Sequence, residues 1–182
     1  MKKITNQFLI ALPNMVDPIF KKSIIYICEH NKDGYMGLII NKPITNNDAK
    51  KITEINTICT NKLSNIYFGG PLNLNQAIVL HDNNYSIEGT SKISKNISLT
   101  ANEGIMSDIE EDIGPDSYKF IIGYSGWAIG QLEKEIENGD WLVASLDGKA
   151  IFDFSEEKKW ATIFSNLGLD VNLFTGGESG VS

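Results

Sequence analysis

The sequence predicts an α/β (α+β) fold in which a curved, mixed or barrel-like β-sheet is flanked by about four helices. Apolar runs rich in Ile, Leu, Val, Phe and Tyr mark the strands, and most of these runs are nearly continuous, which is typical of strands covered on both faces. Several predicted strands follow one another directly, so a strict alternation of strands and helices is excluded. The length of 182 residues is that of one domain, so residues 1–182 are expected to form a single domain with a mobile tail from about residue 175.

The strands are predicted from apolar runs bounded by Gly, Pro, Asn, Asp or Ser. In chain order they are Phe8–Leu12, Ser23–Cys28, Met36–Ile40, Ile66–Phe68, Ala77–Leu80, Tyr118–Tyr124 and Trp141–Leu146. The segment from Asp82 to Ser98 is rich in Asn and Ser, and it is predicted to be a hairpin and loop.

The helices are predicted from apolar residues at helical spacing together with start and stop signals. Thr100-Ala101-Asn102-Glu103 has the pattern of a capping box, and Asn138-Gly139 that of a left-handed stop. The expected segments run from Asp48 to Cys59, from Thr100 to Ile113, through Leu132 and Ile136 to Gly139, and from Ser155 to Gly168.

The charge of the chain argues against direct nucleic-acid binding. There are 16 basic and 23 acidic residues, the net charge is −7, and every basic residue is Lys. Duplex DNA requires a cationic surface, and the planar guanidinium group that reads bases and phosphates is missing. The apolar run Phe8–Leu12 is too short for a signal peptide or a membrane span, so a cytoplasmic protein without membrane contact is expected.

Cys28-Glu29-His30 is the most reactive cluster by composition. On a regular strand Cys28 and His30 share a face, which suggests a Cys–His nucleophile pair or a redox thiol. The alternative is a buried Cys at a strand end followed by turn residues, and the spacing favours it. His81 is the only other histidine, and Cys28 and Cys59 do not form C-x-x-C, so no metal site, disulfide framework or cofactor is predicted.

Gly123-Tyr124-Ser125-Gly126-Trp127 lies between an apolar strand and a predicted helix, the context of a nucleophile elbow. Trp127 stands where that motif needs a glycine. A hydrolase using Ser125 with His81 or His30 is therefore only the alternative enzymatic hypothesis. The simpler interpretation is a glycine-rich turn with Trp127 as a core anchor. The motifs are incomplete, so the chain is not predicted to be an enzyme.

Phe68-Gly69-Gly70-Pro71 indicates a close approach of backbone to a phosphate or to another strand. No phosphate-binding pattern completes it, so a turn that needs positive φ is preferred. A ligand-binding interpretation predicts one pocket that gathers these glycines with polar and aromatic side chains from other strands. Its expected members are Asn41, Gly69, Gly70, Tyr124, Trp127 and Gln131.

Taken together and in order, these blocks resemble the AlgH/YqgE family of bacterial proteins. The matching blocks are Asn6–Ala11, Tyr26–Asn31, Gly34 with Met36–Pro43, Gly69–Pro71 with Val79–His81, Gly123-Tyr124 with Gly126-Trp127, Gly130–Glu133 with Glu135-Ile136, and Trp141-Leu142. The similarity covers nearly the whole chain. It implies a cytosolic protein with a curved, barrel-like sheet, and one branch of the family is described as a transcriptional regulator.

The resemblance implies no established catalytic residue or cofactor. This chain has Gln76-Ala77 where relatives usually have Arg-Gly, and Ser125 where they commonly have Ala. The loss of that arginine weakens an anion-binding role for this block. The function predicted from the sequence is regulation through a protein or small-ligand partner rather than through DNA. The alternative is a small hydrolase or redox-active thiol protein that uses Cys28, His30, His81 or Ser125.

Overall fold

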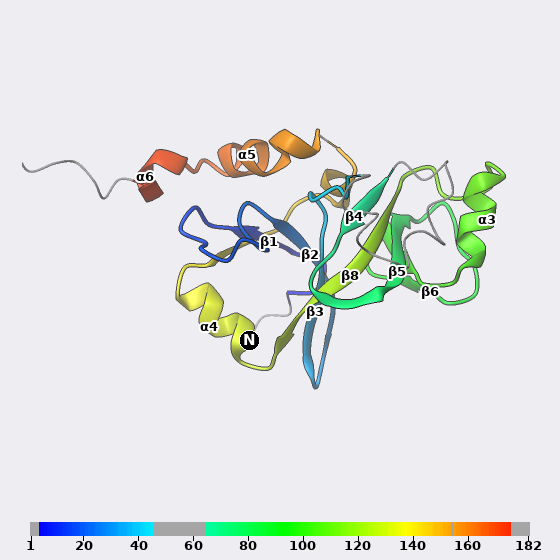
Figure 1. The fold of residues 1–182 in the computed structure, drawn as a ribbon, viewed down its shortest axis with the longest axis horizontal. Coiled ribbons are helices and arrows are strands. Elements are labelled where there is room, and N and C mark those ends of the chain that lie inside the picture. The colour runs from blue at the N-terminus through cyan, green and yellow to red at the C-terminus, as the bar shows by residue number, and fades with distance from the viewer. Residues whose placement is uncertain (1–3, 46–64, 154, 176–182) are drawn as a thin grey trace, which may run out of the picture.

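The computed structural model describes residues 4–45, 65–153 and 155–175. Figure 1 shows the arrangement of the elements in space. In chain order these are β1 (Phe8–Ala11), β2 (Ile24–Asn31), β3 (Gly34–Ile39), β4 (Ile66–Phe68), β5 (Leu72–Asp82), β6 (Thr90–Lys92), β7 (Ile97–Thr100), α3 (Gly104–Glu110), β8 (Tyr118–Ala128), α4 (Gln131–Glu137), β9 (Trp141–Ala144), a 3-10 turn η1 (Gly148–Ile151), α5 (Glu156–Asn166) and α6 (Val171–Thr175).

The strands form one strongly curled sheet of nine strands in the order β6-β7-β5-β8-β3-β2-β1-β9, with β4 added beside β8 (Figure 1). All pairs are antiparallel except β4 and β8, so the sheet is mixed. β8 is the central strand. It pairs with β5 along one edge, and along the other it pairs first with β4 and then with β3. The residues of β8 therefore connect most of the molecule.

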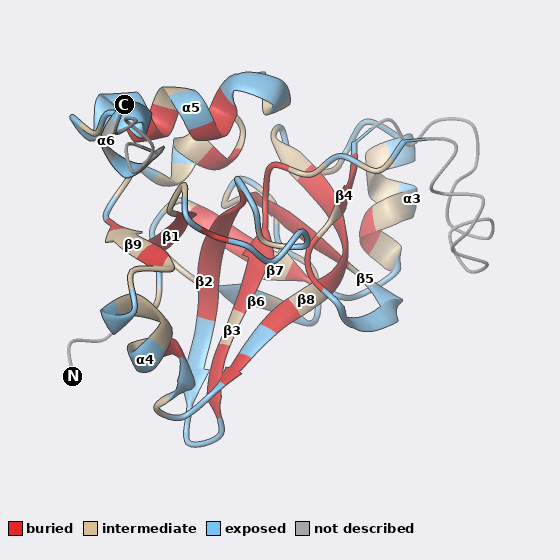
Figure 2. Cartoon of the chain, turned by 60° about the vertical axis from the view of Figure 1, so that its left-hand side comes forward, coloured by how far each residue is buried: buried red, intermediate tan, exposed pale blue. Residues whose placement is uncertain are grey.

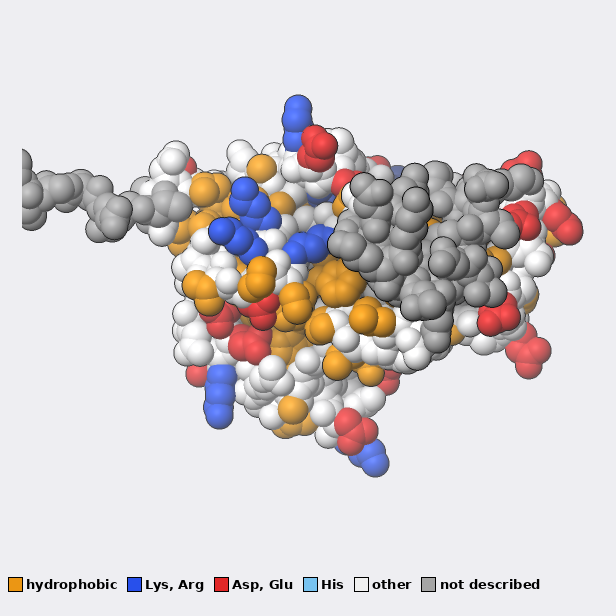
Figure 3. Space-filling view, viewed as in Figure 1, with side chains coloured by type: hydrophobic (Ala, Val, Ile, Leu, Met, Phe, Trp, Pro, Cys, Tyr) orange, Lys and Arg blue, Asp and Glu red, His pale blue; other side chains and the backbone are white. Residues whose placement is uncertain are grey.

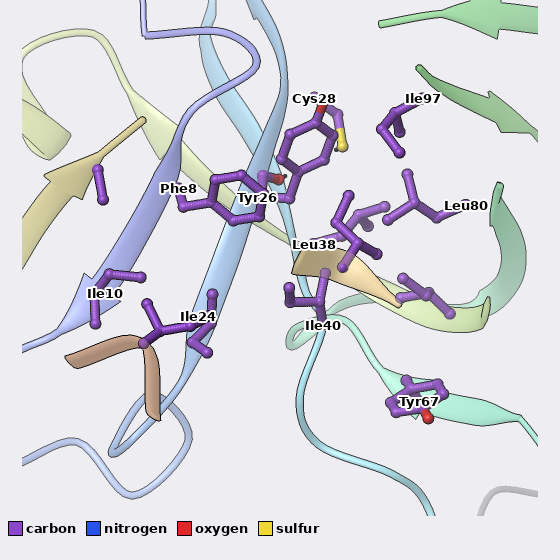
Figure 4. Close-up of a cluster of buried hydrophobic side chains, with 14 of the residues drawn as sticks. Phe8, Ile10, Ile24, Tyr26, Cys28, Leu38, Ile40, Tyr67, Leu80 and Ile97 are labelled. Atoms are coloured by element: carbon purple, nitrogen blue, oxygen red, sulfur yellow. Dashed lines mark hydrogen bonds between the residues drawn. The ribbon is translucent and has the colours of Figure 1, made fainter. Parts of the chain in front are cut away.

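The core lies on both faces of the sheet, because successive residues of the central strands are all buried (Figure 2). Phe8 and Tyr26 point into the larger cluster, which Figure 4 shows, whereas their neighbours Leu9 and Ile25 belong to the cluster on the opposite face. Each fully buried side chain of this size stabilises the fold by about 1.5–3 kcal/mol. This double burial explains why the strand runs show no apolar–polar alternation.

Helices cover the two faces and one end of the sheet. Trp160 and Phe164 of α5 pack into the larger cluster, and the Trp160 indole N–H donates to the carbonyl of Ala11 at 2.8 Å. Leu132 of α4 is buried in the opposite cluster, and Ile105 of α3 lies in a third. Among the described residues, no helix is long and apolar enough to span a membrane.

The predicted fold class is confirmed, but the helix prediction is only partly correct. α4 and α5 are found where expected, α3 lies within the predicted segment Thr100–Ile113 but is shorter at both ends, and α6 was not predicted. The segment Asp48–Cys59 and the tail after residue 175 lie outside the described residues. The capping box at Thr100 is wrong, because Thr100 pairs with Val79 as the last residue of β7. The Asn102 side chain instead accepts from the Gly104 N–H at 2.8 Å. Sheet pairing here overrides a local signal.

The strand positions are confirmed, although several strands differ in extent; β2, for example, continues beyond Cys28 to Asn31. β8 continues beyond Tyr124 to Ala128, and β5 begins at Leu72 rather than Ala77. The first half of β5 is polar and exposed, and a register shift between Leu72 and Ala77 separates it from the buried half. The segment predicted as hairpin and loop contains the β6–β7 hairpin.

Candidate functional site

Cys28 and His30 do not share a face, because a β-bulge interrupts β2 between Ile27 and Glu29. Cys28 is the extra residue at the bulge, and its thiol is buried in the larger core cluster. His30 is exposed on the other face, where its ring stacks on Tyr35 with 4.2 Å between ring centroids. The inference from a regular strand is therefore wrong, and the structure does not form a Cys–His pair.

The environment of Cys28 favours the neutral thiol. Burial raises the pKa of the Cys28 thiol well above its ordinary value, and the nearby Glu29 carboxylate raises it further. The sulfur lies 3.5 Å from the carbonyl oxygen of Tyr26, to which the thiol donates. This is the chemistry of a structural cysteine rather than of a nucleophile.

His81 is fully buried on β5, and each of its ring nitrogens has a partner. Nδ1 donates to the Asp82 carbonyl at 2.6 Å, and Nε2 lies 2.9 Å from the Thr100 hydroxyl, which itself lies 2.8 Å from the Thr90 hydroxyl. Burial lowers the pKa of His81 against the opposing effect of the Asp82 carbonyl. A neutral imidazole that accepts at Nε2 completes this chain, so His81 links β5 to the β6–β7 hairpin.

Ser125 and the glycines of its motif form a backbone crossing. The Ser125 hydroxyl donates to the carbonyl of Gly69 at 3.1 Å and is buried. A Cβ on Gly69 would lie 2.3 Å from the Gly123 carbonyl oxygen, and a Cβ on Gly123 would lie 2.4 Å from that of Gly70. Gly70 and Gly123 also have positive φ. Gly69 and Gly70 thus allow their backbone to pack directly against the backbone of β8, and the hydrogen bond from Ser125 to Gly69 holds the two segments together.

Asn41 and Gln131 also act as structural connectors. The Asn41 side chain accepts from the Ile24 N–H at 2.8 Å and donates to the Lys22 carbonyl at 2.9 Å. The Gln131 side chain accepts from the Ala128 N–H at 3.1 Å and donates to Glu135 at 2.9 Å. These contacts join the start of β2 to the end of β3, and the end of β8 to α4.

Tyr124 and Trp127 line a shared surface groove of about 460 Å³, where β3, β8 and the exposed start of β5 meet. Tyr35, Met36, Leu72 and Gly126 complete its apolar part. Hydrophobic side chains gather over the middle of the face in Figure 3, in front of the crossing of these strands. We call this feature the aromatic groove. Of the six predicted pocket residues, it includes Tyr124 and Trp127.

The rim of the aromatic groove is acidic. Glu29, Asn31 and Asp33 line it at the tip of the β2–β3 hairpin, and none of its described lining residues is a lysine. Asn31 donates to the Glu29 carboxylate at 2.8 Å and accepts from the Asp33 N–H at 2.8 Å, which orders the hairpin tip. An aromatic floor with a carboxylate rim attracts cations that also carry apolar surface.

Trp127 lines this groove from strand β8, while its indole ring is buried in the core cluster on the opposite face of the sheet, where it is held rigidly. Its indole N–H donates to Oε2 of Glu135 at 2.8 Å, and the indole of Trp141 donates to the same oxygen at 2.9 Å. The two indole rings meet edge to face, 6.1 Å between centroids. Glu135 on α4 therefore fixes both rings, so the groove wall is already ordered without a ligand.

A second cluster was not predicted from the sequence: two buried lysines that share one carboxylate. Lys119 of β8 donates to Oε1 of Glu156 at 2.5 Å and to the carbonyl of Ile40 at 3.1 Å. Lys159 lies 3.5 Å from the same Oε1, and the Tyr67 hydroxyl donates to it at 3.1 Å. We call Lys119, Lys159, Glu156 and Tyr67 the lysine cluster.

Burial governs the protonation of the lysine cluster. Burial, and secondly the neighbouring positive charge of Lys159, lower the pKa of Lys119 to about 8 against the attraction of Glu156. The pKa of Lys159 is lowered by burial as well. Burial and the Glu156 carboxylate raise the pKa of Tyr67, so its hydroxyl stays protonated and continues to donate.

The sequence did contain a signal for Lys119. It is the one charged residue in the run Tyr118–Tyr124, and a charge inside an apolar strand needs a buried partner. Lys159 gave a weaker signal, since a lysine before Trp160 on a helix usually faces solvent. No group of three or more His, Cys, Asp or Glu side chains that could hold a metal ion occurs in the described part of the chain.

Comparison with known proteins places these features in a family context. An AlgH-like family model matches residues 8–172. A UPF0301 protein of Pseudoalteromonas translucida is 38% identical over 176 residues, covering 94% of this chain and 95% of that protein. A UPF0301 protein of Saccharophagus degradans is 37% identical over 174 residues, covering 94% and 86% respectively.

Two solved structures share the fold. The solution structure of the AlgH protein from Pseudomonas aeruginosa matches with a TM-score of 0.74 and 29% identity, covering 100% of this chain and 97% of that one. A crystal structure of a protein from Corynebacterium diphtheriae matches with a TM-score of 0.73 and 23% identity, covering 96% and 92% respectively. The curled mixed sheet is therefore common to all three chains.

Proposed function

This chain belongs to the AlgH-like family, and from that premise we propose that it is a binding protein whose aromatic groove takes a basic, partly apolar segment of a partner protein. Such binding, rather than contact with DNA, is how the chain would exert the regulatory role suggested by the family resemblance. The observation that carries the proposal is the combination of an aromatic floor with an acidic rim.

The groove offers both parts of such a recognition site. Tyr124 presents a half-buried aromatic face, and Leu72 is 43% exposed beside it. Rings of this kind bind apolar side chains and the faces of cationic groups. Glu29 and Asp33 then attract the lysine or arginine residues of the partner, which raises the association rate and selects basic segments over acidic ones.

The alternative enzymatic roles draw no support from these contacts. Ser125 donates to a backbone carbonyl instead of an imidazole, and Cys28 is a buried thiol with a raised pKa. The chain's net charge of −7 opposes duplex DNA. Fluorescence anisotropy with a labelled duplex at low salt should therefore show no salt-dependent binding.

A peptide titration tests the proposal. The probe is a short amidated peptide of alternating Lys and Leu, and its Glu/Leu counterpart is the control probe. We expect the Lys/Leu peptide to bind more tightly, and the double variant Glu29→Lys/Asp33→Lys to weaken it about tenfold through loss and reversal of two rim charges. Tyr124→Ala should weaken binding by removing the aromatic contact.

The matched control is Glu88→Lys/Glu111→Lys, which makes the same change in net charge at two exposed positions outside the groove lining. This variant should retain most of the affinity. Equal weakening by both double variants would mean that net charge alone drives binding, and it would overturn the groove as the site.

A further inference from the structure

The lysine cluster buries two ammonium groups side by side. The side chains of Lys119 and Lys159 are 4% and 0% exposed, and one carboxylate, Glu156, faces both. Removing an ammonium group from water costs several kcal/mol, and a buried ion pair is often replaced by apolar residues without loss of stability. Lys159 also donates to the Ile151 carbonyl at 2.7 Å, and the negative charge of Asp153 favours its protonated form. Buried clusters of ionisable groups of this kind occur at functional sites.

This cluster opens to a cavity of about 220 Å³ at the surface. Lys119, Glu156 and Tyr67 line it together with Asn65, Ser117 and a second carboxylate, Asp116. The Lys119 ammonium also lies over the Tyr67 ring, 3.8 Å from its centroid. The cavity therefore brings a small molecule next to a buried amine, a carboxylate and a phenol.

Only one oxygen of the Glu156 carboxylate accepts hydrogen bonds from the described residues. Its Oε1 accepts from Lys119 and Tyr67, whereas Oε2 is buried and has no hydrogen-bond partner among the described residues. A buried acceptor without a donor costs about 1–3 kcal/mol. The Glu156 side chain lines the cavity and is 20% exposed, so a turn of its carboxylate would bring Oε2 to the hydroxyl group of a bound ligand, which would supply the missing donor.

We propose that Lys119 is an imine-forming amine that captures a short hydroxyaldehyde or hydroxyketone in this cavity. The aldehyde or ketone group of the ligand would react with the Lys119 amine, and its hydroxyl group would donate a hydrogen bond to Oε2 of Glu156. A site of this kind does not depend on the aromatic groove, which lies at the other end of β8.

The reaction needs only the groups present. Glu156 takes one proton from the Lys119 ammonium, and the freed lone pair on nitrogen attacks the carbonyl carbon. The C–O bond then breaks, and the oxygen leaves as water carrying two of the three ammonium protons. The product is a protonated imine, so the positive charge on Lys119 is kept, Glu156 returns to its carboxylate form, and nothing is oxidised or reduced.

The second lysine supports this chemistry. A lysine is activated as a nucleophile when it is desolvated or placed beside another cation, because both conditions favour the neutral amine. Lys119 meets both conditions, and the lowering of its pKa by burial and by Lys159 agrees with this. Lys159 is thus a positioning residue that acts through Lys119.

Reductive trapping tests the proposal on the full chain. The native protein is treated with glycolaldehyde and cyanoborohydride at pH 7.5, and the modification of each lysine is followed by peptide mass spectrometry. Lys119 should be modified about tenfold faster than the exposed Lys158, because its larger neutral fraction outweighs its lower basicity. Modification of Lys119 at or below the rate of Lys158 would overturn the proposal.

Propanal, which replaces the hydroxyl of glycolaldehyde by a methyl group, tests the ligand class. The ratio of Lys119 to Lys158 modification should fall with propanal, whereas an unchanged ratio would overturn the role assigned to Glu156 Oε2. Lys159→Met should slow the modification of Lys119, and the exposed control Lys158→Met should not. Circular dichroism checks that both variants are folded. If Lys159→Met does not fold, the comparison of Lys119 with Lys158 in the wild-type protein tests the proposal.

Discussion

The aromatic groove and the lysine cluster lie on the same strand, β8, but the charged groups of the groove are exposed and those of the lysine cluster are buried. At the end of β8, the carboxylates of Glu29 and Asp33 sit exposed at the rim, keep their hydration and remain available for a charged partner. At its start, Lys119 is buried with Lys159, and loss of hydration changes its protonation. Exposure thus separates a site suited to recognition from a site suited to chemistry.

Removal of the shared carboxylate should produce the largest difference between the two regions. Glu156→Gln removes the carboxylate that the two buried lysines share, so we expect a loss of about 3 kcal/mol in the free energy of unfolding. Glu29→Gln at the exposed rim should change it by less than about 0.5 kcal/mol. Urea denaturation measures both, with the exposed neighbour Glu157→Gln as the control. Equal effects of the three substitutions would remove the distinction.

The pH dependence of stability should reflect the lysine cluster next. The pKa of Lys119 is lowered from 10.5 to about 8, so the unfolded chain binds more protons than the folded chain between these values. The free energy of unfolding should therefore rise with pH, by about 1–2 kcal/mol between pH 8 and 10. Above pH 10, the raised pKa of Tyr67 opposes this trend.

Urea denaturation at several pH values tests that rise. Lys119→Met removes the group responsible, so the curve for this variant should be flatter between pH 8 and 10. Lys158→Met, an exposed substitution on α5, should leave the slope unchanged. A falling or flat curve for the wild-type chain would contradict the assigned protonation.

A substitution at Glu135, which holds Trp127 beside the groove, should change the free energy of unfolding less. Glu135→Gln weakens the hydrogen bonds from both Trp127 and Trp141, because a neutral amide oxygen replaces a carboxylate. We expect a loss of about 1 kcal/mol together with a change in tryptophan fluorescence. Gln131→Ala, which leaves both indole bonds in place, should change the fluorescence less. The reverse order would show that Glu135 does not fix the rings.

The residues explain which parts of the fold the sequence could predict. Strands such as Phe8–Leu12 were found because continuous apolar runs report burial on both faces directly. Thr100 was misassigned because its pairing partner, Val79, is distant in sequence and outweighs the local capping signal. The start of β5 was missed because its exposed polar residues lack any apolar pattern.

The candidate site was harder to predict because it depends on geometry that composition does not contain. A single bulge at Cys28 moves His30 to the opposite face and removes the most reactive-looking pair. The glycines Gly69 and Gly70 serve a backbone crossing, so they shape the fold instead of lining the groove. Lys119 gains its importance only from Lys159 and Glu156, which come from a helix far along the chain.

Mapping of peptide binding by NMR tests the central claim most directly. The Lys/Leu peptide is titrated into isotopically labelled protein, and backbone amide shifts are followed residue by residue. We expect the shifts to concentrate at Tyr35, Leu72, Tyr124 and Gly126, while the amide signals of Lys119 and Glu156 do not shift. Shifts centred on another surface, or spread evenly over the acidic residues, would contradict the aromatic groove as the binding site.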